Sequence, residues 1–151
     1  MDNSIENQIL IDLKNAMLAK DKVKLEALRA VKSVFLLEKT KEGSSGIISN
    51  ELAQQLISKL HKQRMDAYKI YLEQKREDLA SVELSQAKVL EIYLPEQLNV
   101  DELTKELQKI IDSLGATSIS DIGKVMGKAM AVLKGKAEGS LISKIIKDLL
   151  R

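Results

Sequence analysis

The chain has 151 residues, of which 44% are hydrophobic and 30% charged, and 24 Lys and Arg against 22 Asp and Glu give a net charge of +2. This composition is that of a globular protein, and it excludes a disordered chain and a membrane-spanning segment of about 20 apolar residues. Because the sequence contains no cysteine and no recognisable secretory signal, we exclude disulfides and thiolate chemistry and expect a cytoplasmic protein.

Four amphipathic helices are predicted before the single proline, Pro95. Ser4 and Asp21 are suitable N-caps for the first two, in which apolar residues recur at helical spacing. The segment Glu42–Ile48 contains two glycines and two serines and predicts a loop. The third and fourth helices are expected at about Asn50–Gln74 and Asp78–Leu94, and Pro95 ends the last of them.

Three shorter helices are predicted after the proline. They are expected at Asp101–Leu114, Asp121–Lys134 and Ser140–Leu150, and Gly115 and Gly135 end the first two. No segment alternates with the period of a strand. The sequence therefore predicts an all-α protein, with a four-helix bundle in residues 1–95, a linker in residues 96–100 and a small three-helix domain in residues 101–151.

Three polar residues in the first domain are candidates for chemistry. Gln63 and Glu83 fall on the apolar faces of their helices, so a buried carboxylate for acid/base work is one interpretation of Glu83. A hydrogen bond across the bundle is the more frequent situation for such a group. His61 lies opposite the leucine stripe, which predicts a surface histidine without further metal ligands. We therefore expect no catalytic residue, no metal site and no cofactor.

Small residues recur every fourth position in the sixth predicted helix. Gly123, Gly127 and Ala131 leave one helical face nearly bare, and Lys124 and Lys128 stand beside it. Close approach and positive charge suit an RNA sugar-phosphate backbone. A tight crossing with another helix is the alternative. If RNA binds, the candidate residues are Gly123, Lys124, Gly127, Lys128, Lys134 and Lys136.

Several motifs resemble the YqeY-like protein family across essentially the whole chain. They are Arg76–Leu79, Tyr93–Leu98 and Gly123–Gly127. The second half is also similar to the tail domain of the GatB subunit of glutamine-dependent aminoacyl-tRNA amidotransferases, through Gly123–Met126, Lys134–Ala137 and the terminal helix. This resemblance implies an all-helical fold of two subdomains. It also implies tRNA holding and not catalysis, because that tail lies remote from the catalytic centres of the amidotransferase.

Three hypotheses follow for the function. The first is a non-catalytic module that binds tRNA or another structured RNA, or is otherwise associated with translation. The second is an adaptor that binds a translation-related protein through the same bare face. The third is an accessory component of a carbon-nitrogen ligase, the tRNA amidotransferase, without catalytic activity of its own. None of them involves a membrane or a metal ion.

Overall fold

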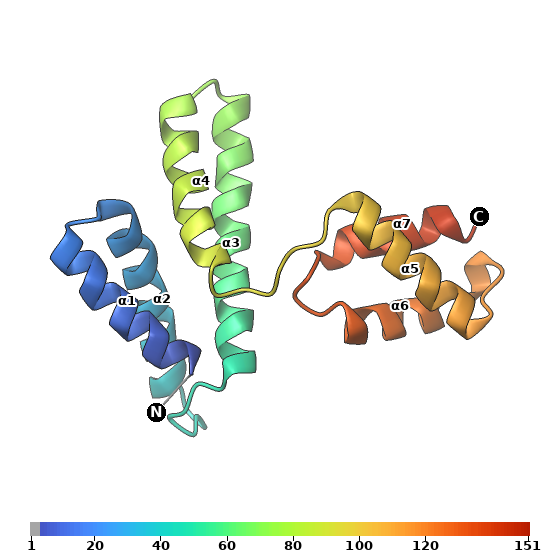
Figure 1. The fold of residues 1–151 in the computed structure, drawn as a ribbon, viewed down its shortest axis with the longest axis horizontal. Coiled ribbons are helices and arrows are strands. Elements are labelled where there is room, and N and C mark those ends of the chain that lie inside the picture. Colours follow the sequence, from blue (N-terminus) through green and yellow to red (C-terminus); the bar gives the residue numbers. More distant parts are fainter. Residues whose placement is uncertain (1–3) are drawn as a thin grey trace. The chain divides into compact units, whose positions relative to one another are not determined.

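The structure is a computed structural model that describes residues 4–151 (Figure 1). Within this range the chain forms seven α-helices and one short 3₁₀ helix, without any strand, so the all-α prediction is confirmed. The chain divides into two compact units, one ending at Leu94 and the other spanning Pro95–Arg151. Across residues 4–151, no helix combines the length and hydropathy that a membrane span requires.

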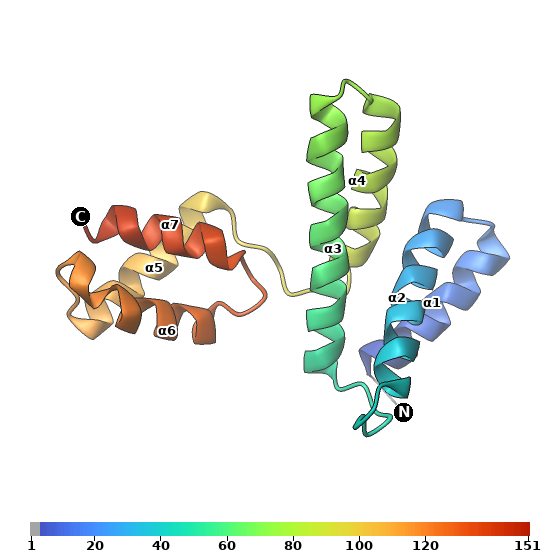
Figure 2. The same cartoon turned by 180° about the vertical axis from the view of Figure 1, so that it is seen from behind.

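The N-terminal unit consists of two helical hairpins. In Figures 1 and 2, α1 lies beside α2 and α3 beside α4. Both predicted caps are confirmed: Ser4 Oγ accepts the Asn7 N–H at 3.1 Å, and Asp21 Oδ1 accepts the Lys24 N–H at 3.2 Å. The helices are α1 (Ile5–Ala19), α2 (Lys22–Thr40), α3 (Asn50–Glu73) and α4 (Glu77–Glu91).

One apolar core holds the four helices together. Each helix contributes at least one fully buried side chain, such as Ile9, Leu28, Ile57 and Leu90. Helix α4 ends at Glu91, three residues before the predicted end, and in the turn that follows Tyr93 and Leu94 pack partly buried side chains against this core. The last turn is tightened instead of α-helical, since the N–H groups of residues 92–94 donate to carbonyls three residues back, at 3.2 to 3.4 Å.

The C-terminal unit is a three-helix assembly with its own core. Gly115 closes α5 in the left-handed conformation, with φ of 64°, as the sequence predicts. Helix α6 ends at Val132, so Lys134 lies outside it. The core is built from apolar residues of all three helices and of the segment after α6. The elements are α5 (Val100–Leu114), the 3₁₀ helix η1 (Ile119–Asp121), α6 (Ile122–Val132) and α7 (Gly139–Leu149).

The segment that precedes α5 is attached to the C-terminal unit. The Leu98 N–H donates to the Lys136 carbonyl at 3.0 Å, and the Gln97 side-chain amide donates to the Gly135 carbonyl at 2.6 Å. Leu98 also packs against the core of this unit. Residues from Pro95 onward are therefore anchored to the loop between α6 and α7.

Candidate nucleic-acid interface

Helix α6 carries the predicted RNA-binding residues, and its orientation follows from its apolar side. Val125 and Ala129 are fully buried in the core of the C-terminal unit. Because an α-helix turns by about 100° per residue, positions 123, 127 and 131 lie on the opposite side. All three residues are exposed. Gly123, Gly127 and Ala131 are called the small-residue stripe below.

No other part of the C-terminal unit packs onto the two glycines of the small-residue stripe. A Cβ atom added at Gly123 or Gly127 would meet no atom within 4 Å, apart from the helix itself. A tight helix crossing, the alternative reason for such a stripe, is therefore absent within the C-terminal unit. The stripe is an open surface on which a ligand can reach the helix backbone directly.

Lysines line one edge of the stripe. Lys124 and Lys128 are exposed, and neither makes an ion pair within the described part of the chain. Lys134 and Lys136 are exposed in the loop after α6, where the Lys136 carbonyl holds Leu98. The structure thus places two of the four candidate lysines on the helix and two in the loop that follows it.

The sequence around the stripe carries an excess of positive charge. Residues 118–151 contain 7 Lys and Arg against 3 Asp and Glu, and no acidic residue occurs between Asp121 and Glu138. The carboxylate of Asp121 is already engaged, since it accepts the backbone N–H groups of Thr117 and Ser118 at 3.0 and 3.4 Å. An anion on the stripe would therefore meet the lysines of α6 and its loop, while Glu138, at the far end of that loop, is the one carboxylate there without a hydrogen-bond partner within residues 4–151.

The buried polar residue of the N-terminal unit differs from the prediction. Gln63 is exposed, so its placement on the apolar face was wrong. Gln86 is buried instead, with 8% of its surface exposed. Its side-chain oxygen accepts a hydrogen bond from Arg64 Nε at 3.1 Å, and its amide donates to Glu26 at 2.8 Å. The spacing of Gln86 four residues before Leu90 is the signal that could have identified it.

The other two polar candidates offer no catalytic arrangement. Glu83 is half-buried, and its carboxylate makes no hydrogen bond or ion pair within residues 4–151. His61 was predicted to face solvent, but it is half-buried and its Nε2 lies 3.0 Å from Glu91 Oε1, which joins α3 to α4. Among the residues that the structure describes, no group of three or more His, Cys, Asp or Glu side chains is placed to hold a metal ion.

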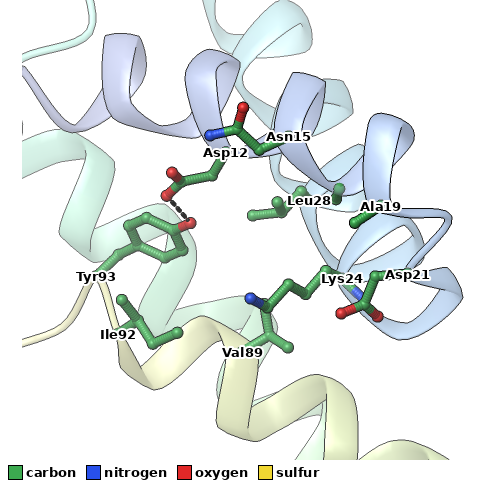
Figure 3. A pocket seen from close by; sticks show the side chains of 10 residues that line it. Asp12, Asn15, Ala19, Asp21, Lys24, Leu28, Val89, Ile92 and Tyr93 are labelled. Atoms are coloured by element: carbon green, nitrogen blue, oxygen red, sulfur yellow. Dashed lines mark hydrogen bonds between the residues drawn. The ribbon is translucent and has the colours of Figure 1, made fainter.

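A small cavity lies between α1, α2 and the end of α4, and sequence reasoning did not identify it (Figure 3). Its volume is about 270 Å³. At its edge the Tyr93 hydroxyl donates to Asp12 Oδ2 at 2.5 Å, and burial together with this bond raises the pKa of Tyr93. Asp12 Oδ1 accepts a second bond from the Gln8 amide at 2.8 Å. The contact thus ties the end of α4 to α1.

Comparison with known protein families gives a match over nearly the whole chain. The family model described as Yqey-like protein matches residues 6–150, which is nearly the whole chain. The chain belongs to the YqeY-like protein family. This assignment confirms the resemblance seen in the sequence motifs.

Curated relatives of this YqeY-like protein are named "Altered inheritance of mitochondria protein 41, mitochondrial". The protein from Pyrenophora tritici-repentis is 29% identical, over 99% of this chain and 82% of the relative. The protein from Clavispora lusitaniae is 24% identical, over 96% and 89%. The protein from Saccharomyces cerevisiae strain YJM789 is 30% identical, over 78% of this chain and 65% of the relative.

These relatives contradict the predicted cytoplasmic location, because their names place them in mitochondria. The prediction was wrong because the lack of cysteine, on which it partly rested, does not identify a compartment. The absence of cysteine excludes disulfide bonds, but it does not distinguish among the compartments in which proteins fold without them.

Proposed function

We propose that this YqeY-like protein is a non-catalytic module that holds tRNA, or another structured RNA, on the small-residue stripe of α6. The observation that carries this proposal is the open stripe beside Lys124 and Lys128. A protein that used these glycines for its own packing would cover them. The similarity of this segment to the tail domain of GatB supports the same function.

The chemistry of the surface fits an RNA backbone more closely than RNA bases. Glycine lets a phosphate or ribose approach the helix without meeting a side chain, and the lysines supply positive charge. No aromatic residue occurs between Gly123 and Arg151, so stacking platforms for single strands are absent from this segment. We therefore expect binding that follows RNA shape and phosphate spacing, with little dependence on sequence.

The decisive experiment measures tRNA affinity at several salt concentrations for the wild type and for a variant with four substitutions. In this variant, Lys124, Lys128, Lys134 and Lys136 are changed to Ala. If each lysine contacts one phosphate, the slope of log affinity against log salt falls by about three units, because one contact contributes about 0.7 to 0.9. Affinity should decrease for all tRNA sequences alike.

A matched control removes the same charge from the other unit. Lys14, Lys22, Lys32 and Lys59 are exposed, and changing all four to Ala also lowers the net charge by four. This control should keep the salt slope of the wild type, because only local phosphate contacts determine it. Equal slopes for the wild type and the α6 variant would refute the proposed surface. Failure of the wild type to bind tRNA at low salt would instead favour a protein partner helix on the stripe.

A further inference from the structure

A second surface feature of the C-terminal unit is a shallow apolar pocket at the start of α6. Its volume is about 650 Å³, within the range of small-molecule sites. Ile119, Ile122 and Leu150 form its apolar floor, and Ile119 remains 50% exposed. A half-exposed isoleucine on a concave surface leaves apolar area that a ligand can cover.

The rim of this pocket is cationic. Lys147 and Arg151 line it, both are exposed, and neither makes an ion pair within residues 4–151. The Thr117 side chain also lines the pocket, and its hydroxyl makes no hydrogen bond within the same range. The nearby carboxylate of Asp121 is engaged by backbone N–H groups. The complementary ligand is therefore flat or compact, apolar and anionic, with hydrogen-bonding edges.

We propose that this pocket takes one unpaired nucleotide of the RNA that binds α6, an inference that rests on the proposed function. The base covers the exposed surface of Ile119, its edge meets the Thr117 hydroxyl, and its phosphate lies near Lys147. A nucleotide combines an apolar face, polar edges and negative charge. These three features match the apolar floor, the Thr117 hydroxyl and the cationic rim of the pocket.

The position of the pocket also favours a nucleotide over an acidic peptide. Ile122 lines the pocket, and Gly123 begins the small-residue stripe on the next residue of the same helix. The two residues are consecutive but point about 100° apart around the helix, so a strand that passes from the stripe to the pocket turns around the start of α6. A strand that leaves an RNA helix held on the stripe can place its first unpaired nucleotide at η1. The module would then recognise a junction between paired and unpaired RNA.

The first test titrates adenosine 5′-monophosphate into the full chain and follows methyl signals by NMR. Chemical shift changes are expected at Ile119, Ile122 and Leu150, and not at the exposed methyl groups of Val132, which lies at the other end of α6. Changes at Val132 equal to those at Ile119 would overturn the proposal. Perturbation of the pocket by an acidic, leucine-containing peptide but not by the nucleotide would also overturn it, in favour of a protein ligand.

The second test compares binding of a blunt RNA hairpin with that of the same hairpin carrying a single-stranded 3′ overhang. The wild type should prefer the overhang by about fivefold, because the base covers apolar surface of Ile119 that stays exposed when a blunt hairpin binds. Ile119→Ser and Lys147→Ala should each reduce this preference and leave blunt-hairpin binding nearly unchanged. The matched controls are Val132→Ser, since Val132 is 47% exposed, and Lys144→Ala on the same helix as Lys147.

The outcomes separate this inference from the proposed function. If the wild type binds both hairpins equally, the nucleotide pocket is refuted and RNA binding on α6 stands. If the control variants lose the preference as much as the pocket variants, the assignment to this pocket is also refuted. If the wild type binds no RNA, the proposed function fails, and the pocket inference that rests on it fails with it.

Discussion

Replacing Gly127 by Ala should stabilise this protein and weaken its binding of RNA. Gly127 lies inside α6, and its φ is not in the left-handed region. A methyl group at this position would meet no atom within 4 Å. Glycine therefore contributes nothing to packing here, and it loses more backbone entropy on folding than alanine does. A functional role of Gly127 would therefore come from a ligand that contacts this exposed face of the helix.

The expected gain in the free energy of unfolding is about 0.5–1 kcal/mol, the difference between Gly and Ala inside a helix. For a small domain this corresponds to a rise in Tm of roughly 2–8 °C. Gly115→Ala is the control of opposite sign. Its added methyl group also meets nothing, but φ of +64° places it in the left-handed region, which costs about 1–2 kcal/mol for alanine.

Thermal unfolding followed by circular dichroism, together with tRNA binding at low salt, provides the assay. Gly127→Ala should raise Tm and lower affinity, and Gly127→Leu should lower affinity further, because a larger side chain keeps the phosphate farther from the helix. A Gly127→Ala variant less stable than the wild type would refute the open geometry of the stripe. A Gly127→Leu variant that is more stable and binds tRNA normally would refute the stripe as the binding surface.

Two further predictions concern polar contacts of the N-terminal unit. Gln86→Ala should destabilise this unit by about 1–2 kcal/mol, because Arg64 and Glu26 each lose a hydrogen bond, whereas Gln63→Ala, at an exposed position, should change stability by less than about 0.5 kcal/mol in urea unfolding. Tyr93→Phe should also destabilise the unit, since its hydroxyl donates to a carboxylate. Because the pKa of Tyr93 is higher in the folded state than in the unfolded state, its contribution to the free energy of unfolding is fully present below about pH 10, the ordinary tyrosine value. This contribution is lost as the pH rises further. The difference in stability between wild type and Tyr93→Phe should therefore shrink above pH 10. A constant difference from pH 8 to pH 11 would contradict this account.

Helix existence and caps could be predicted from the sequence because they depend on neighbouring residues. Ser4, Asp21 and Gly115 act through backbone groups within a few positions of themselves, and all three behave as predicted. The end of α6 was predicted two residues too late. Gly135 has φ of +78° beyond the helix, and there its role is to turn the chain toward α7.

Contacts between helices could not be predicted in the same way. By helical spacing, Gln63 and Gln86 could each be the buried polar residue of the N-terminal unit. The packing of α2, α3 and α4 determines that it is Gln86, which hydrogen-bonds Arg64 and Glu26. The open side of α6 is a similar case. The sequence identified the small residues and lysines, but whether another helix covers them depends on long-range packing.

The joint between the units leads to a last prediction, on where the C-terminal unit must begin to fold alone. The Asn99 side chain caps α5 by accepting the Glu102 N–H at 2.8 Å, and Leu98 packs on the core and bonds the Lys136 carbonyl. A fragment of residues 101–151 lacks these contacts. The loss is about 1 kcal/mol for the cap, about 1 for the hydrogen bond and about 1 for a partly buried leucine.

Together these losses approach the 3–5 kcal/mol that a core of this size supplies. We therefore expect residues 95–151 to fold cooperatively, and residues 101–151 to be largely unfolded by circular dichroism. Asn99→Ala in the longer fragment isolates the cap and should lower stability by about 1 kcal/mol. Equal Tm for the two fragments would mean that the segment before α5 is a passive tether. A lower Tm for the shorter one would mean that this segment is part of the folded unit, because its hydrogen bonds and apolar contact close the loop between α6 and α7.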